Sequence, residues 1–534
     1  MKFILPTICF IFNVLIAEIY PLAQKPFLKG LDVSDGFSRG IFLIIVAEEE
    51  LVEKLSDQGV GDFIYFKQTQ GFDVEVWNYE EIGSKEQLRS NLEEYYTANP
   101  LLEYVLLIGD SDPDEQDYPI EAFKIPSYNR AEMDVTDHPF TYFSGNVDTD
   151  DGLNPRFFIG RWSIKESSDI KKIQRKTIQY ILMEFTEDTS YVERALVVAG
   201  SYKTDAGNNE VYPFDWPVSP VWTSLWLQDR LTQFGYSKVD TALFYSGNRI
   251  LTNPILKNSW DNGVGIINYR GWGNADGWAK PQFLYTDIPH LNVTYDLPVV
   301  FSFVCNTGDF GSNVEPSFGE ALLRAGTTGN PKGAVAMIGP SDLDTDTRFN
   351  NVMCGALWDG LLEGRTPELA QALHAAKQAV AKEFSGITET GDGEAQDIPV
   401  FYHHVYGVLG DPSLPVWLSR PTDLSVLNDE SESINGNLLL TDKFINIVVQ
   451  DSEGQSVQDV VGALLYNGKL IAKGLSTIDG NLDIDFTEIS DITAGSEMEL
   501  YLNKAQFFQK NISVTLSEDN SNVFGTHPYG YQLP

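Results

Sequence analysis

Two short segments carry residue types that could perform nucleophilic chemistry. Residues 266–278 read IINYRGWGNADGW, and residues 298–310 read PVVFSFVCNTGDF. Each begins with an apolar, β-branched run and ends abruptly in Gly, Asn and Asp, which predicts a buried strand followed by a loop. Loops at the carboxyl ends of parallel strands are where open α/β sheets bind ligands. Cys305, a lone cysteine in such a loop, is therefore a candidate nucleophile.

The elements that must position these loops alternate between strand and helix patterns over the first 420 residues. Apolar runs predict buried strands and amphipathic or capped segments predict the helices between them. This alternation is typical of a doubly wound, mostly parallel sheet. The predicted strands span residues 41–47, 73–77, 104–110, 156–160, 195–200, 265–269, 298–305 and 333–338.

The pattern changes after Pro421. Helical periodicity disappears, and short alternating strands follow one another, separated by turns such as Asn467-Gly468 and Asp479-Gly480. Such spacing predicts a small β-sandwich of immunoglobulin type.

The amino terminus and the overall charge indicate where the protein acts and which partners it excludes. Met1-Lys2, the apolar run 3–17 and the small residues up to Ala23 predict a secretory signal peptide over residues 1–23, with no membrane span in the mature chain. A formal net charge of -39 repels phosphates, so nucleic acid is excluded as a partner. Of the three cysteines, one falls in the predicted signal and Cys354 lies in an apolar helical pattern, so no disulfide framework is expected.

Longer stretches around the two loops point to one family. Residues 317–323 read SFGEALL, residues 406–414 read YGVLGDPSL, and residues 102–110 read LEYVLLIGD. In this order and spacing they resemble the gingipain family of cysteine peptidases, which have a caspase-like fold. The resemblance implies two caspase-like α/β subdomains with mostly parallel sheets, over residues 29–162 and 163–420. An immunoglobulin-like domain over 421–516 and a tail over 517–534 then follow.

The resemblance also assigns roles in the site and exposes one departure. In the family the first loop carries Gly-His-Gly, whose His is the general base, but here that position holds Trp272. The backbone amides of Gly273 and Cys305 are implied as the oxyanion hole. An indole exchanges no proton near neutral pH, so we weigh His138 as a substitute base. The companion aromatic Trp278 is expected to stack on a substrate side chain.

Acidic residues suggest a metal. Asp148, Asp150 and Asp151 alternate as carboxylates do in Ca²⁺ loops, and Asp342, Asp344 and Asp346 repeat the pattern. Gingipains bind calcium structurally, so the resemblance implies a structural Ca²⁺ at one such loop, with no cofactor required for catalysis. The alternative is a solvated acidic loop in an acidic protein.

These observations support a secreted, extracytoplasmic cysteine endopeptidase that acts on proteins or peptides through a Cys305 thiolate. The alternative is a catalytically dead pseudopeptidase that binds peptides or a partner protein, because Trp272 replaces the base. A third interpretation is an exported processing enzyme that acts on the partner proteins of a secretion system. The sequence assigns no residue to a specificity pocket.

Overall fold

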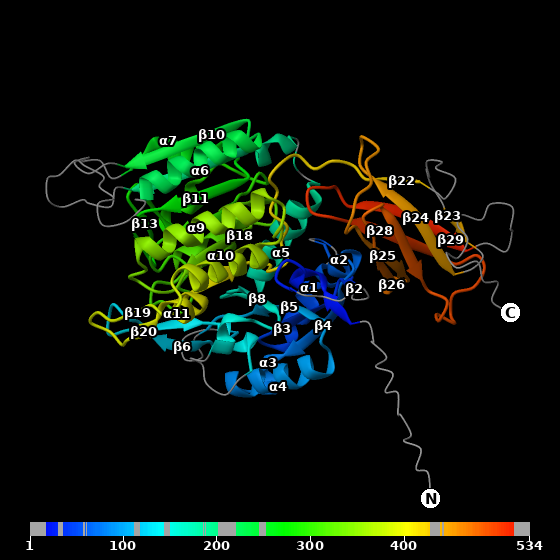
Figure 1. Ribbon diagram of the computed structural model, residues 1–534, viewed down its shortest axis with the longest axis horizontal. Coiled ribbons are helices and arrows are strands. Elements are labelled where there is room, and N and C mark those ends of the chain that lie inside the picture. The colour runs from blue at the N-terminus through cyan, green and yellow to red at the C-terminus, as the bar shows by residue number, and fades with distance from the viewer. Residues whose placement is uncertain are drawn as a thin grey trace, which may run out of the picture.

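The structure is a computed structural model of the 534-residue chain. It describes residues 18–29, 36–56, 59, 61–111, 118–143, 150–184, 186, 188–200, 220–244, 252–427, 438–440 and 443–516. A large α/β unit is flanked by a smaller all-β unit (Figure 1).

A single twisted sheet forms the centre of the α/β unit. Within the described residues it has ten strands in the order β10-β9-β11-β15-β18-β21-β8-β5-β3-β4. All neighbours in this sheet are parallel except β18 and β21, which are antiparallel. The strands are β3 (Ile41–Val46), β4 (Asp73–Asn78), β5 (Leu102–Ile108), β8 (Phe158–Trp162), β9 (Arg194–Gly200), β10 (Lys238–Phe244), β11 (Ile266–Arg270), β15 (Val299–Phe303), β18 (Ala336–Pro340) and β21 (Tyr406–Leu409).

The two predicted subdomains therefore share one sheet. The first supplies β4, β3, β5 and β8, the second supplies the other six strands, and the two halves join where Leu409 of β21 pairs with Arg161 of β8. The mixed α/β architecture with a mostly parallel sheet confirms the predicted fold class. Its central strands are mostly apolar because helices cover both of their faces, as every residue of β5 and of β15 is buried.

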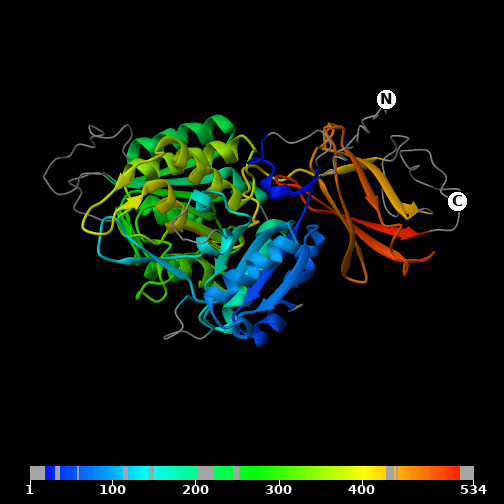
Figure 2. The same ribbon diagram turned by 60° about the horizontal axis from the view of Figure 1, so that its bottom comes forward.

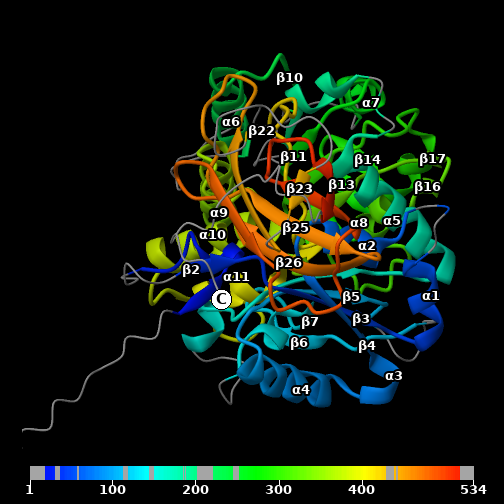
Figure 3. The same cartoon turned by 90° about the vertical axis from the view of Figure 1, so that its right-hand side faces the viewer.

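Helices form a layer on each side of the sheet. Figure 3 shows α6 (Pro220–Phe234), α9 (Thr347–Leu362) and α10 (Leu369–Glu383) on one side, and α5 (Ser167–Leu182), α7 (Pro254–Asp261) and α8 (Phe318–Arg324) on the other. The remaining α-helices among the described residues are α1 (Val52–Leu55), α2 (Phe63–Thr69), α3 (Tyr79–Ile82), α4 (Lys85–Ala98) and α11 (Ile398–Val405).

The carboxy-terminal unit is a sandwich of two sheets. In the described part of the chain they have the orders β22-β24-β27 and β23-β29-β28-β25-β26. Ile447, Leu464 and Val514 belong to a core that is separate from that of the α/β unit. The strands are β22 (Ser425–Leu427), β23 (Leu438–Leu440), β24 (Phe444–Gln450), β25 (Val461–Tyr466), β26 (Lys469–Leu475), β27 (Asn481–Asp485), β28 (Glu497–Asn503) and β29 (Lys510–Leu516). The immunoglobulin assignment of this sandwich stays a prediction.

Polar contacts attach the sandwich to the first half of the sheet. Tyr65 of α2 and Tyr501 of β28 share a hydrogen bond of 2.8 Å between their hydroxyls, and Lys473 of β26 pairs with Asp73 of β4 at 2.6 Å. Figure 2 shows the sandwich lying to one side of the α/β unit. A small apolar cluster of Ala463, Leu465 and Tyr501, with Tyr65 packed against it, accompanies these polar contacts.

The segment that follows residue 18 is part of the fold. Strand β1 (Ile19–Pro21) pairs with β2 (Gly36–Ser38), and the buried Ala23 donates its amide to Glu103 Oε1 at 2.6 Å. The predicted signal peptide extends to Ala23, so its last residues, from Ile19 onward, belong to a segment that packs in the fold. Residues 1–17 and the predicted tail 517–534 lie outside the described residues. Among the described helices, none combines the length and apolar character that a membrane span requires.

Because the sandwich has its own core, residues 421–516 alone should fold. We expect an all-β far-UV circular dichroism spectrum with a cooperative thermal transition, and a soluble, folded partner fragment ending at Arg420. The control is the full chain, whose spectrum should equal the sum of the two fragments. Two fragments that both lack a cooperative transition would contradict the boundary.

Candidate active site

The loop after β15 holds the cysteine in a fixed turn. Cys305 lies two residues past the end of this strand and is partly exposed. Asn306 adopts a left-handed conformation with φ of 55°, and its amide donates to Asp342 O at 2.7 Å. Its side-chain amide donates to Asp309 Oδ2 at 2.9 Å and to Ser341 O at 2.5 Å. These bonds stabilise a conformation that a non-glycine residue seldom adopts.

The loop after β11 lies beside it because the two strands are parallel neighbours. The hydroxyl of Tyr269 donates to Trp272 O at 2.7 Å and accepts from Trp272 N at 3.2 Å, which closes the turn. Gly273 then begins the short strand β12 (Gly273–Asn274), which pairs with β13 (Gly277–Ala279). A Cβ at Gly273 would lie 3.1 Å from Val304 Cγ1 and Thr307 Cγ2, so the backbone here runs close to the cysteine loop.

The two loops line one open cleft of about 530 Å³. Residues of both subdomains contribute to it. The lining consists of Asn129, Arg130, Gly271, Trp272, Gly273, Cys305, Leu343, Asp344, Thr345, Asp346 and Thr347. The structure thus brings together three of the predicted site residues, Cys305, Trp272 and Gly273.

The surroundings of the thiol keep it protonated. Burial raises the pKa of Cys305 to about 12, and the negative charges of Asp342 and Asp344 raise it further, against the opposing effect of the Thr345 hydrogen bond. Thr345 contacts the sulfur with its hydroxyl at 3.7 Å and its carbonyl at 3.8 Å. With a pKa of about 12, roughly one thiol in 10⁵ is ionised at pH 7.

The cleft has one cation, and a carboxylate already binds it. Of the described residues that line the cleft, Arg130 alone carries a positive charge, and its Nε forms an ion pair with Asp344 Oδ2. Arg130 is about half exposed, so this pair is screened by water and contributes little to stability. Arg130 was not predicted as a site residue, and Asp344 was considered only as a calcium ligand. Their pairing was not predicted because they lie in different subdomains and no local pattern links them.

Trp272 places an indole at the position where the family has the imidazole of its general base. Trp272 is 40% exposed at the rim of the cleft, and the ammonium of Lys280 lies 5.6 Å from the centroid of its ring. Among the described residues that line the cleft there is no histidine. No lining side chain in the described chain therefore supplies the neutral base that a thiol would need near pH 7.

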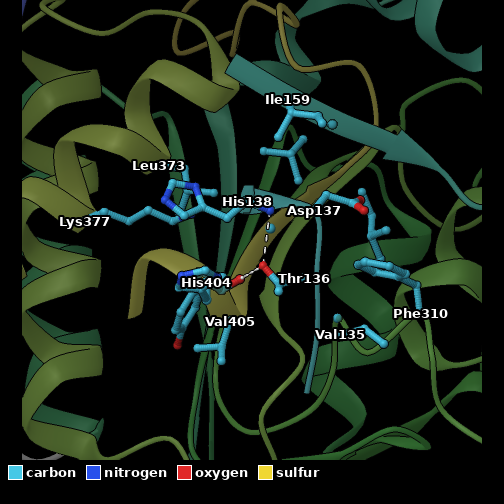
Figure 4. A pocket seen from close by; sticks show the side chains of 16 residues that line it. Val135, Thr136, Asp137, His138, Ile159, Phe310, Leu373, Lys377, His404 and Val405 are labelled. Carbon is cyan, nitrogen blue, oxygen red and sulfur yellow. Dashed lines mark hydrogen bonds between the residues drawn. The ribbon is translucent and has the colours of Figure 1, made fainter. Parts of the chain in front are cut away.

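His138 is not a substitute base in this structure. It begins the 3-10 helix η3 (His138–Thr141), is buried, and lines a separate cavity of about 50 Å³ with Thr136, Lys377 and His404 (Figure 4). Its Nε2 faces the carbonyl of Gly152, and burial together with the charge of Lys377 lowers its pKa well below 6.5. The prediction of a relocated base at His138 is wrong because packing between the sheet halves encloses this ring.

Trp278 is also placed differently from the prediction. Its side chain is fully buried and stacks on Tyr269, with ring centroids 4.5 Å apart and planes 2° apart. Its Nε1 donates to Ser302 Oγ at 3.0 Å. It cannot stack on a substrate, because the hairpin β12–β13 turns this side chain into the core, where it supports the loop that carries Trp272.

Of the two acidic loops, the structure describes the side chains of the second only. Asp148 lies outside the described residues, and the backbones of Asp150 and Asp151 form the 3-10 helix η4 (Asp150–Leu153). Of the second series, Asp344 binds Arg130, and Asp346 caps α9 by accepting from Arg348 N at 2.8 Å. A calcium site at residues 148–151 therefore stays a prediction.

The fold and the cleft together define a class, a caspase-like α/β protein of the cysteine peptidase type. The model of peptidase family C25 matches residues 38–417, which is more than half of the chain, and the chain therefore belongs to this family. The predicted membership of the gingipain family of cysteine peptidases is confirmed, and proteins or peptides are the substrates that such a family implies.

Curated relatives and a solved structure agree with this assignment. The chain is 26% identical over 459 residues to Gingipain R2 of Porphyromonas gingivalis, covering 82% of this chain and 55% of that protein. It is 25% identical over 446 residues to Gingipain R1 of the same species, covering 80% of this chain and 39% of that protein. The crystal structure of the Arg-specific cysteine proteinase gingipain R superposes with a TM-score of 0.71 at 21% identity, over 90% of this chain and 98% of that one. The chain thus spans about half or less of the length of these curated relatives.

The pKa of Cys305 predicts how the thiol reacts with a neutral alkylating reagent. We expect the rate constant to rise about tenfold per pH unit from pH 7 to pH 10 without a plateau, because the thiolate fraction rises in that proportion below a pKa of about 12. Mass spectrometry of the modified peptide measures it, and Cys305→Ser is the control for background labelling. A plateau near neutral pH would reveal a thiolate paired with a cation and would contradict this description.

Proposed function

We propose that this chain is an exported member of peptidase family C25 that binds a protein or peptide segment in the Cys305 cleft and hydrolyses it far more slowly than a cysteine peptidase. The observation that carries the proposal is the composition of the cleft, where Cys305 and an indole at the base position line the same space and no histidine belongs to the described lining. The geometry favours the binding alternative over the endopeptidase.

Two features of the cleft lower the expected rate of hydrolysis. A cysteine peptidase needs a thiolate for attack and an acid that protonates the leaving amine. Loss of the general acid–base group costs on the order of 10²–10⁴ in rate. The high pKa of Cys305 adds to this, since the ionised fraction near neutral pH is only about one in 10⁵.

The cleft favours a basic segment as its ligand. Asp344 and Asp346 line the cleft with two carboxylates. Trp272 offers a partly exposed aromatic face that already contacts the ammonium of Lys280. The formal net charge of -39 attracts basic peptides over longer distances. A solved relative is described as Arg-specific, which agrees with this choice. An arginine of the bound segment would replace Arg130 at Asp344.

Export is part of the proposal. It is supported by the apolar run 3–17 after Lys2, as in a signal peptide. The contacts of Ala23 with Glu103, and the bond of 2.9 Å from Gln371 Nε2 to Ala23 O, favour cleavage before Ile19 over cleavage after Ala23.

The second candidate is the active endopeptidase, which one observation favours. Cys305 and Gly273 remain in the same cleft, and the backbone at Gly273 runs close to the cysteine loop. If these amides still form an oxyanion hole, proton transfer alone is lacking.

Affinity for a basic peptide should depend on Asp344. We expect Asp344→Asn to weaken binding of a fluorescent Arg-containing peptide about 10- to 100-fold, because a charge-assisted hydrogen bond is lost and Arg130 is left to repel the ligand. Fluorescence anisotropy measures the dissociation constant. The exposed Glu94→Gln removes the same charge from α4 and should bind like the native chain. Equal affinities for all three proteins would place the ligand elsewhere.

Restoring an imidazole separates the two candidates. Trp272→His should raise hydrolysis of peptide substrates on the order of 10²–10⁴-fold, because a proton acceptor then lies beside the thiol in an otherwise intact cleft. Trp272→Phe, which removes the indole without adding a base, should stay inactive, and adding Cys305→Ala to Trp272→His should abolish the gain. Substantial hydrolysis by the native chain that disappears in Cys305→Ala would establish the endopeptidase instead.

A further inference from the structure

An open cavity lies where the amino-terminal segment, the α/β unit and the sandwich meet. It encloses about 360 Å³, which is within the range of pockets that hold small ligands. Residues 22–26 form one wall, the end of α6 and the loop between α9 and α10 form another, and the loop between β28 and β29 forms the third. In Figure 2 the dark blue amino-terminal segment lies between the two units. The cavity is separate from the Cys305 cleft, with which it shares no lining residue.

Apolar side chains from all three walls line this cavity. The largest are Leu22, Phe234, Leu361, Leu362, Leu418 and Phe507. Phe234, the last residue of α6, keeps 43% of its surface exposed. Apolar surface in a concave site is favourable for binding, because a ligand that covers it removes it from water. The cavity therefore favours a ligand with an apolar body.

Three of the four basic side chains that line the cavity are paired with carboxylates. The pairs are Arg39 with Glu103 and Glu368, Arg365 with Asp359 and Glu363, and Lys25 with Asp459. The fourth, Lys504, forms no ion pair with any residue that the structure describes, and its Nζ donates to Gln458 O at 2.6 Å. An ammonium carries three N–H donors, so Lys504 can still donate to an anionic ligand.

The surroundings of Lys504 disfavour its charge when the cavity holds no anion. Burial lowers the pKa of Lys504, attraction to Asp459 opposes this shift, and repulsion from Lys25 adds to it. Lys25 already contacts both oxygens of Asp459, at 2.7 Å and 2.6 Å. Two ammonium groups thus share one carboxylate, although the formal net charge of the chain is -39. One additional negative charge would balance this group, whereas a doubly charged ligand would be repelled by Asp459.

We propose that this cavity binds an apolar chain that ends in a single carboxylate, as in a medium-chain fatty acid. The carboxylate would accept a charge-assisted hydrogen bond from Lys504. The chain would extend over the apolar walls, where Phe234 and Phe507 offer aromatic surface. The inference does not depend on whether the Cys305 cleft binds or cleaves peptides.

Such a ligand would contact three parts of the molecule at once. The amino-terminal segment is attached to the α/β unit through Ala23, whose amide donates to Glu103 and whose carbonyl accepts from Gln371 Nε2 at 2.9 Å. The same segment contacts the sandwich through the ion pair of Lys25 with Asp459. A bound chain would add apolar contacts between these parts. Binding should therefore raise the melting temperature of the full chain, because the ligand binds the folded state only.

The test is isothermal titration of the delipidated full chain with decanoate below its micelle concentration. We expect one saturable site, and about fourfold weaker binding for each methylene that is removed from the chain of the acid. Decanol, which has the same chain without the charge, should bind about 10- to 100-fold more weakly than decanoate, because the hydrogen bond to a charged acceptor is lost. Decanol or decyl phosphate that binds more tightly than decanoate would overturn the carboxylate assignment.

Substitutions locate the site. Lys504→Met keeps an aliphatic side chain without the charge, so it should bind decanoate about 10- to 100-fold more weakly and decanol as the native chain does. Phe234→Ser, at a partly exposed position, should weaken the binding of both ligands. Lys469→Met, on the exposed surface of β26 and outside the cavity, is the matched control and should bind like the native chain. Thermal melting without ligand checks that each variant is folded.

The proposal is overturned if decanoate shows no saturable binding to the native chain. It is also overturned if Lys504→Met and Phe234→Ser both bind decanoate with the native affinity, because the ligand would then lie elsewhere. No peptide enters this experiment, so either result would leave the proposed function untouched.

Discussion

The parallel pairing of β11 with β15 is the constraint on which the candidate site depends. Parallel neighbours end at the same edge of a sheet, so the loops that carry Trp272 and Cys305 must lie side by side whatever their sequence. The surrounding features serve this juxtaposition. Trp278 and Tyr269 stack beneath the first loop, and Asn306 fixes the second one by bonds to the segment after β18. The frame of a cysteine peptidase is thus maintained independently of the residue at position 272.

The charges around Cys305, rather than the positions of the loops, limit proton transfer in the cleft. Caspase-like peptidases need a thiolate, and a thiolate needs a positive or proton-accepting neighbour. Here Asp342 and Asp344 raise the pKa of the Cys305 thiol further, while the arginine of the cleft is paired with Asp344. His138, His374, His403 and His404 lie close to one another away from the cleft, and burial lowers the pKa values of His138, His374 and His403. Among the described residues that line the cleft, no histidine stands beside the thiol.

Carboxylates also predominate at the junction between the two subdomains. Asp344 and Asp346 are exposed enough to meet a basic ligand, whereas Asp134 and Asp342 are enclosed and hydrogen-bonded to each other. Both sets belong to the same junction of the hairpin formed by β6 (Phe123–Pro126) and β7 (Met133–Thr136) with the segment after β18.

The sequence by itself determined the class of the fold, the break near Pro421, the family, and the presence of Cys305, Trp272 and Gly273 in one site. These features follow from local periodicity and from motifs along single strands, which depend on residues close in the chain. Tertiary structure alone decided the rest. Trp278 was predicted to stack on a substrate but is buried by a hairpin, and His138 was weighed as a base but is enclosed between the sheet halves. Arg130 joins Asp344, and Asp134 joins Asp342, across more than 200 residues, and no local pattern can encode such a meeting because the topology of the sheet creates it.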